Sequence, residues 1–279
     1  HYIKLTQDWS LTTLAYRTEF ARNWKKLDKF DNSAASGLSG CDSIDEILRE
    51  PELCAQEMDV LRGEYGYTSA DDVLGIRENN RSYYAQGIQM GLGGVISHGD
   101  YTHNLSLSAR YHEDGVDRFQ QQDQYKIHNG VLIKTTDNQV GSQANRLSGA
   151  RALSAYIEDR LVHGGLTVTA GLRVEDVDSQ QDRWDTPDRS LAPSSQRKNR
   201  YAEVLPSLAG LYTLNSDMAV YGGVHRGFSA APVSSQQSTD PEESTVYEGG
   251  VRYTGANSLS LDATVFANDY ANLLGECTN

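Results

Sequence analysis

The feature that most constrains the fold is a strict alternation of apolar and polar side chains, which is clearest in residues 259–268. Five apolar residues share one side of an extended segment there, namely Leu259, Leu261, Ala263, Val265 and Ala267. Ser260, Asp262, Thr264 and Asn268 share the other side, and Phe266 interrupts the pattern. Because side chains two residues apart in a β-strand lie on the same face, this segment predicts a strand in a sheet with one apolar and one polar side.

The same alternation recurs along the chain and predicts about ten strands. Short turns are expected at 7–8, 98–100, 163–165, 215–217 and 254–257, and they alternate with long polar segments. Tyr101 and Tyr111 stand at the two ends of one apolar face, as in the aromatic girdles of a barrel wall. A soluble sandwich would mix loop lengths at both ends, and a propeller would show a repeat of about 40 residues. We therefore predict an antiparallel transmembrane β-barrel.

Composition and the chain ends restrict the class of protein. The formal net charge of −13 over 279 residues argues against nucleic acid as a partner. The chain starts without Met or a signal-like region and ends inside an expected loop, so we expect an internal part of a longer barrel protein.

Three segments break the strand pattern and are expected to be loops. Residues 22–79 are too long for an inert connection, and we expect a functional, lid-like loop with two short helices. Ser43 is a plausible N-cap for the first helix, and Pro51 is expected to start the second, which reaches about Arg62. Residues 112–145 and 177–199 are expected to be further polar excursions, the first with a small hairpin.

The three cysteines form an odd set. Cys41 and Cys54 bracket a short polar segment without histidine, which favours a loop disulfide in an oxidising compartment over two free thiols. Cys277 would then pair with a residue beyond this sequence.

Two motifs resemble a known family. HRGFSAAP (residues 225–232), followed by DPEESTVYEGGVRY (residues 240–253), resembles the late-barrel signature of TonB-dependent outer-membrane receptors. The segments TTLAYRTEFARNWKKLD and FANDYANLLGECT are most similar to the ferric-citrate-type branch. Gly249 stands where the family more often has leucine.

The resemblance implies a fold, a location and a function. Residues 1–279 would form part of one barrel domain of roughly 22 strands, with residues 22–79 as a long extracellular loop. The plug domain, the TonB-coupling segment and the closing strands would lie outside this sequence. The protein would sit in the bacterial outer membrane, in contact with its lipid, and import a ferric siderophore with energy supplied through TonB. Iron would enter only as chelated cargo, without a resident cofactor.

Arginines near the outer ends of the predicted strands are candidate ligand-binding residues. We expect Arg81, Arg110, Arg151, Arg173 and Arg226 on the inward face, with Gln86 and Gln89 as hydrogen-bonding neighbours. Guanidinium groups bind carboxylates in planar bidentate pairs, which suits an anionic citrate-like chelate. Alternatively, each arginine pairs with Glu175, Glu248 or a plug carboxylate and has a structural role.

Other functions remain open. No Ser/His/Asp set, close carboxylate pair or metal-ligand spacing is evident, so we expect neither enzymatic activity nor a protein-bound metal. The family also carries cobalamin, saccharides and other metal chelates. A passive porin or an adhesion barrel is the alternative from another class.

Overall fold

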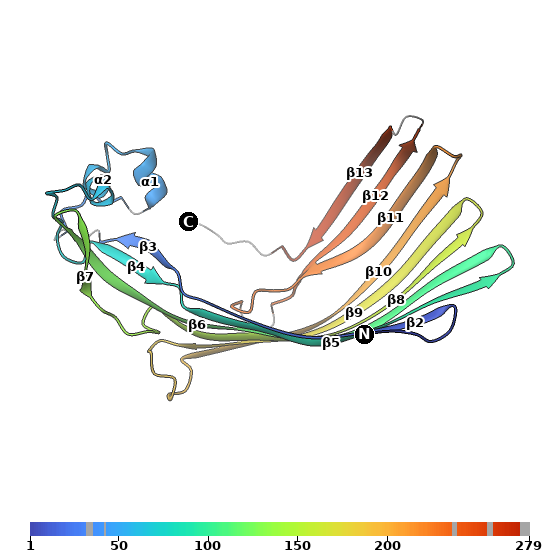
Figure 1. Cartoon of the computed structure of the whole chain (residues 1–279), viewed down its shortest axis with the longest axis horizontal. Coiled ribbons are helices and arrows are strands. Elements are labelled where there is room, and N and C mark those ends of the chain that lie inside the picture. The colour runs from blue at the N-terminus through green and yellow to red at the C-terminus, as the bar shows by residue number, and fades with distance from the viewer. Residues whose placement is uncertain (32–35, 42, 236–238, 256–258, 274–279) are drawn as a thin grey trace.

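The computed structural model describes residues 1–31, 36–41, 43–235, 239–255 and 259–273, which form one curved antiparallel sheet of 13 strands (Figure 1). The strands are β1 (Tyr2–Lys4), β2 (Trp9–Arg22), β3 (Lys25–Phe30), β4 (Leu74–Glu78), β5 (Arg81–His98), β6 (Tyr101–His128), β7 (Val131–Thr136), β8 (Ala144–His163), β9 (Leu166–Trp184), β10 (Ser195–Thr213), β11 (Met218–Ser229), β12 (Glu242–Thr254) and β13 (Ser260–Ala271).

Ten of these strands form a simple meander, as the alternation predicts. Their order is β1-β2-β5-β6-β8-β9-β10-β11-β12-β13, and the sheet is open because, in the described part of the chain, each end strand has one neighbour. The tight turns after β5 and β8 contain Gly99 and Gly164 in the left-handed region, with φ of 59° and 56°. Glycine adopts that conformation without steric cost. The antiparallel barrel architecture is confirmed, as part of a barrel.

Two of the expected loops are wrong in extent, because the strands continue into them. β6 runs to His128, β9 runs to Trp184 and β10 begins at Ser195. These extensions carry polar residues on both faces, so they give no apolar alternation. Their backbone groups are nevertheless paired in register, for example Asp178 with Arg200. The strands therefore extend well past the segment that an apolar band can mark.

The segment between β2 and β5 folds into a packed cap rather than an open loop. It contains α1 (Ile44–Arg49), α2 (Ala55–Arg62), β3 and β4, and it packs against the far end of β6 and against β7. The predicted N-cap is confirmed, since the Ser43 hydroxyl accepts a hydrogen bond from the Glu46 amide. The second helix begins at Ala55 instead of Pro51, because residues 51–54 form a turn. We call residues 25–78 and 121–136 the distal cap.

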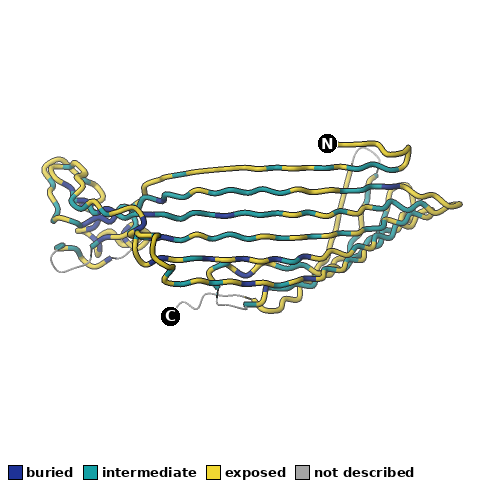
Figure 2. Tube along the Cα trace, turned by 90° about the horizontal axis from the view of Figure 1, so that it is seen from below, coloured by how far each residue is buried: buried dark blue, intermediate teal, exposed yellow. Residues whose placement is uncertain are grey.

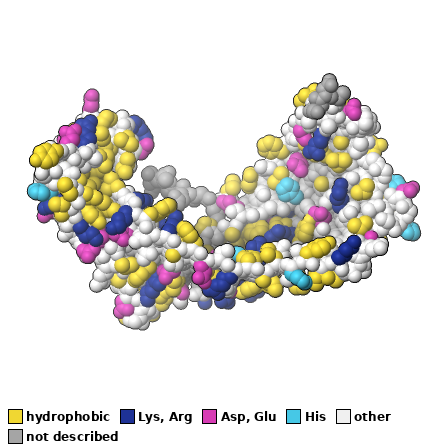
Figure 3. Space-filling model, in the orientation of Figure 1, with side chains coloured by type: hydrophobic (Ala, Val, Ile, Leu, Met, Phe, Trp, Pro, Cys, Tyr) yellow, Lys and Arg dark blue, Asp and Glu magenta, His cyan; other side chains and the backbone are white. Residues whose placement is uncertain are grey.

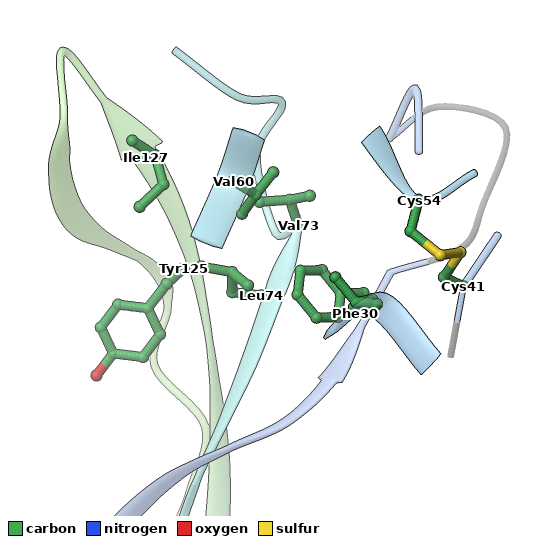
Figure 4. Packing of buried hydrophobic residues seen from close by; sticks show 9 residues of the cluster. Phe30, Cys41, Cys54, Val60, Val73, Leu74, Tyr125 and Ile127 are labelled. Atoms are coloured by element: carbon green, nitrogen blue, oxygen red, sulfur yellow. A yellow bond between two sulfur atoms is a disulfide. The ribbon is translucent and has the colours of Figure 1, made fainter. Parts of the chain in front are cut away.

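The distal cap has the main hydrophobic core of the described chain (Figure 4). Ile47 of α1, Val60 of α2 and Val73 before β4 are each at most 2% exposed. Phe30, Leu74, Tyr125 and Ile127 surround them, and Cys41 is joined to Cys54 by a disulfide. The buried residues concentrate at the end of the sheet that carries the cap (Figure 2). The cap is therefore a preformed unit at the end opposite to the short turns.

The strand register separates two faces of the long sheet. On one face, near the short turns, lie Leu11, Met90, Leu107, Ile157 and Leu172, and they line a shallow apolar groove. The opposite face is polar, and its buried polar residues on β9 and β10 include Glu175, Gln181 and Asn199. We call the apolar side the outward face and the polar side the inward face, as in a membrane barrel. Neither helix of the described chain has the length and apolar character needed to cross a membrane.

Candidate ligand-binding site

Five arginines form a straight row across the inward face. Register pairs Arg22 of β2 with Arg81 of β5, and Arg81 with Arg118 of β6. The row continues from Arg118 to Arg146 of β8, and from Arg146 to Arg183 of β9. Residues directly opposite each other in an antiparallel sheet point to the same face, and neighbouring strands are about 4.8 Å apart. We call these five residues the arginine row.

The arginine row lies beyond the membrane-spanning part of the strands. Its members on β5, β6, β8 and β9 are each 17 residues from the strand end at the short turn: 98 and 81, 118 and 101, 163 and 146, 183 and 166. A tilted strand crosses the hydrocarbon region in about 10 residues. The row therefore stands in the upper lumen, near the distal cap. Figure 3 shows the hollow between the cap and strands β11–β13.

Few acidic groups neutralise the arginine row. Arg183 pairs with Asp185 at 3.1 Å, but more than half of each side chain is exposed. Arg118 donates from Nε to Gln120 at 2.8 Å, a neutral partner. In the described part of the chain no ion pair joins a carboxylate to Arg22, Arg81 or Arg146, and the buried Nε atoms of Arg22 and Arg81 have no hydrogen-bond partner.

The electrostatic consequence is a shift of two of the pKa values. Burial, followed by the charges of Arg81, Arg146 and Arg77, lowers the pKa of Arg118 to about 10. Burial and the neighbouring charges of Arg183, Arg197 and Arg81 also lower the pKa of Arg146. Cations held together in this way repel one another, and an anion bound between them would relieve that repulsion. The arrangement is suited to binding an anion with several carboxylates.

The other predicted inward arginines lie lower in the sheet and have partners. Arg110 donates to the Tyr16 hydroxyl from Nη2 at 2.8 Å. Arg173 donates from Nε to Glu175 at 2.6 Å. Arg226 pairs with Glu243, but the expectation that it lies on the inward face is wrong, because it shares the face of Val224, whose register partner Leu208 pairs with Ala170 on the outward face of β9. Arg173 and Arg226 also border one pocket of about 310 Å³. These three residues therefore fit the structural alternative better than Arg81 does.

The expectation that Arg151 lies on the inward face is wrong. Arg151 is the register partner of Glu113 and Asp178 on the outward face, and its Nε lies 3.7 Å from Glu113. It shares the odd numbering of Leu153 and Ile157, whose apolar side chains mark the outward face of β8. Counting from them gives the correct face.

The two predicted glutamines are on opposite faces. Gln86 is outward, where it donates to Glu113 at 3.2 Å and accepts from Arg17 at 3.0 Å. Gln89 is inward and opposite Arg110. Gln86 and Arg151 thus stand apart from the arginine row, beside an outward cavity of about 780 Å³ whose lining includes Arg151.

The sequence prediction missed Arg22, Arg118, Arg146 and Arg183. For Arg118, Arg146 and Arg183 the equal spacing of 17 residues from the short turn was the available signal, because it places arginines of consecutive strands at one height. Arg22 lies 13 residues from the start of β2 and has no such signal. Arg197 of β10 belongs to the same area, since it pairs in register with Gln181, two residues before Arg183. Apolar alternation alone could not identify them.

The predicted cysteine pair, Cys41 and Cys54, forms a disulfide in the distal cap, apart from the arginine row. Cys277 is outside the described residues. Within the described ranges no three His, Cys, Asp or Glu side chains are grouped closely enough to hold a metal ion.

Comparisons with known proteins agree with this architecture. The family model described as TonB dependent receptor-like, beta-barrel, matches residues 2–279. The structure of the ferric citrate transporter FecA in its unliganded form superimposes with a TM-score of 0.67 at 16% identity, over 96% of this chain and 33% of that one. The ferric-catecholate import receptor Fiu from E. coli K12 superimposes with a TM-score of 0.65 at 12% identity, over 96% of this chain and 39% of that one.

A third similar structure is the siderophore receptor PiuA from Acinetobacter baumannii. It gives a TM-score of 0.63 at 14% identity, over 95% of this chain and 38% of that one. The chain thus spans between a third and two fifths of the length of these three proteins. At such identities the likeness establishes the fold alone.

Proposed function

This chain belongs to the TonB-dependent receptor-like β-barrel family, and we propose that it is part of an active transporter for an anionic ferric chelate. The family consists of receptors in the bacterial outer membrane, where this chain is located. The apolar outward groove near the short turns is the surface that contacts lipid. Energy would come through TonB by way of the rest of the receptor.

The observation that carries the proposal is the arginine row. Five guanidinium groups stand on adjacent strands in the upper lumen, and the described part of the chain supplies one exposed carboxylate to them. An incoming anion would therefore meet unpaired donors, and charge-assisted hydrogen bonds to such donors are roughly twice as strong as neutral ones. A chelate with several carboxylates would engage adjacent members of the row.

A citrate-like ferric chelate suits this geometry best. Its carboxylates match the planar donor pair of each guanidinium, and its net negative charge would offset the mutual repulsion within the row. A saccharide would leave the charges of the row uncompensated, and so would any other neutral cargo. Iron would pass only as chelated cargo, with no chemical conversion and no resident cofactor.

The structural alternative is that carboxylates of the plug neutralise the row in the resting receptor. Variants of the full-length receptor that remove charge distinguish this structural role from binding of the cargo. The double variant Arg81→Gln, Arg118→Gln removes two inward charges of the row. The double variant Arg151→Gln, Arg200→Gln is the matched control, because it removes two outward charges that pair with Glu113 and Asp176.

The experiment measures saturable binding of radiolabelled ferric citrate to cells that carry each variant. Loss of two charge-assisted contacts should weaken binding at least tenfold in the inward variant and leave the outward control unchanged. Cells without TonB should bind the chelate but not accumulate it. Equal binding by the inward variant and the wild type would contradict the proposal, and so would accumulation without TonB.

A further inference from the structure

Two ionisable side chains stand on the outward face, within the band of the barrel that contacts lipid. His103 of β6 and Asp159 of β8 are diagonal neighbours, because register pairs Asp159 with Leu105. Nδ1 of His103 lies 2.7 Å from Oδ2 of Asp159. Both residues share the odd numbering of Leu107 and Ile157, which line the outward groove. We call His103 and Asp159 the outward pair.

The outward pair lies just inside the membrane boundary at the short turns. Tyr101 and Tyr212 mark that boundary, since they are 47% and 50% exposed at strand ends beside short turns. His103 is two residues from Tyr101, and Asp159 is four residues from the end of β8 at His163. Short turns of such barrels face the periplasm, and charged side chains near the membrane interface cost far less than at the midplane. The pair is therefore at the level of the lipid headgroups of the periplasmic leaflet.

The outward pair has hydrogen-bonding capacity that the described chain does not use. An ionised carboxylate only accepts, so Nδ1 of His103 donates to Asp159. Oδ1 of Asp159 is buried and has no hydrogen-bond partner among the described residues, although the side chain as a whole is 37% exposed. Nε2 of His103 also makes no hydrogen bond within the described ranges. Ionisable residues at membrane depth are rare and mark functional sites.

The apolar groove begins beside the outward pair on the same face. Ile157, two residues from Asp159, lines this groove of about 420 Å³ together with Leu107. Ala109 and Ala155 are register partners that also line it, and both are exposed. Their small side chains leave the groove open. Because the groove is farther from the short turns than the pair is, a lipid with its headgroup at the pair extends its acyl chains over the groove, towards the membrane midplane.

The charges of the outward pair select one kind of headgroup. A primary ammonium has three N–H donors and can donate to the Asp159 carboxylate. A phosphate beside that ammonium can accept from Nε2 of His103 when the ring is protonated. A purely anionic headgroup would meet the carboxylate of Asp159 with a like charge, which is unfavourable. A quaternary ammonium has no N–H to donate.

We propose that the outward pair binds the headgroup of a phospholipid with a primary ammonium, of the phosphatidylethanolamine type, with its acyl chains in the apolar groove. The site holds one lipid of the periplasmic leaflet against β6 and β8. It lies on the opposite face of the sheet from the arginine row, so it does not depend on the cargo.

The experiment measures lipid binding to the purified full-length receptor by native mass spectrometry. The probes are phosphatidylethanolamine, phosphatidylcholine and phosphatidylglycerol with identical acyl chains, each added at the same low concentration. The wild type should bind its first phosphatidylethanolamine molecule about tenfold more tightly than either of the other lipids, which is the effect of one charge-assisted hydrogen bond. Equal affinities for the three lipids would contradict the proposal, because the surface would then make only unspecific lipid contacts.

Variants separate the headgroup contact from general lipid contact. Asp159→Asn removes the carboxylate charge and should abolish the preference for phosphatidylethanolamine. Glu158→Gln is the matched control, because it removes a carboxylate from the adjacent residue, which faces inward, and should keep the preference. Ala155→Leu fills the groove and should weaken binding of all three lipids alike while the preference remains.

The outcomes decide for or against the outward pair. If Asp159→Asn keeps the wild-type preference, the ammonium binds elsewhere on the barrel and the proposal is wrong. A wild-type preference for phosphatidylglycerol would assign the surface to His103 and a phosphate alone, which also contradicts it. Unchanged lipid binding by Ala155→Leu would exclude the groove as the place of the acyl chains. Loss of the preference in Asp159→Asn but not in Glu158→Gln supports the site.

Discussion

Tyr16 reaches across an entire strand to bond His112: its Oη lies 2.5 Å from Nδ1 of His112. Tyr16 is on β2, His112 is on β6, and Gly87 of β5 is the register partner of both. A Cβ atom at position 87 would lie 2.6 Å from the Tyr16 hydroxyl. The absence of a side chain at Gly87 is therefore what allows the contact.

The hydrogen bonds around this contact have a defined direction. Arg110 can only donate, and its Nη2 lies 3.2 Å from Nδ1 of His112, so Nδ1 carries no hydrogen. The Tyr16 hydroxyl therefore accepts from Arg110 and donates its own hydrogen to Nδ1 of His112. Nε2 of His112 then carries the ring hydrogen and donates to Asp114 at 3.1 Å. The network links β2 to β6 below the arginine row.

Replacing Gly87 by Val should break this network. The new side chain would displace the Tyr16 ring and would also press on the Tyr111 carbonyl oxygen, which lies 2.5 Å from the Cβ position. The expected cost is about 1–3 kcal/mol in the free energy of unfolding, as for other overpacked sites. Gly91→Val is the matched control, because its nearest atom would be 3.9 Å away on the same strand and face. Thermal unfolding of the purified receptor measures both variants. Equal melting temperatures for Gly87→Val and Gly91→Val would show that the receptor accommodates a side chain at position 87 without losing stability.

Removing one charge from the arginine row should stabilise the ligand-free receptor. The folded-state pKa of Arg118 is lowered, so its charged form is disfavoured in the fold at any pH below about 10, and the penalty is relieved as the pH rises through that value. Arg118→Gln should therefore raise the free energy of unfolding at neutral pH by about 1 kcal/mol, with allowance for partial exposure. Arg200→Gln, which breaks the ion pair with Asp176, should not. A less stable Arg118→Gln receptor would contradict the repulsion argument.

The sequence predicted the strands and turns because one face of each membrane-spanning segment must be apolar. That requirement ends where the strands leave the membrane. β6 continues from Tyr111 to His128, and between His112 and Gln124 it has polar residues on both faces, so alternation does not mark that part. Such segments are held by backbone pairing, which any residue except proline supplies.

The candidate site was only partly predictable for a related reason. Arg81 was identified, but the row is a property of register between strands, and Arg146 and Arg183 become neighbours only when each strand is counted from its turn. Arg151 was placed on the wrong face by a count shifted by one residue, which is enough to reverse a side chain.

The buried carboxylate of the distal cap should make the stability of the cap depend on pH. Burial opposes ionisation of Asp123, but hydrogen bonds from Lys134, the Asn138 amide and Gln121 outweigh it and lower the pKa of Asp123. The stabilisation is therefore present above the unfolded-state pKa of about 3.9 and is lost as the pH falls through the lower folded-state value.

The variant Asp123→Asn tests this dependence. It should destabilise the cap by about 2 kcal/mol at pH 7, since Lys134 is partly exposed, and the difference from wild type should shrink below about pH 4. Asp137→Asn removes the exposed second partner of Lys134 and should change stability by less than about 1 kcal/mol. Hydrogen exchange of cap amides measures both. A difference independent of pH would rule out the ionised carboxylate as the cause.

The Cys41–Cys54 disulfide should hold the cap without contributing to the sheet. It closes a loop with a sequence separation of 13, and beside it the buried Glu57 carboxylate accepts hydrogen bonds from the Gly40 and Cys41 amides. A disulfide that closes a loop of this length stabilises the fold by about 3 kcal/mol, mainly because it restricts the unfolded chain. The double variant Cys41→Ser, Cys54→Ser should therefore be cleaved by trypsin at Arg49 or Arg62 under conditions where the wild type resists. Cleavage at Arg173, within β9, should stay absent in both, because the cap core packs on the end of β6 and contains no residue of β9. Resistance of the double variant equal to that of the wild type would mean that the packing of Ile47 and Val60 alone holds the cap.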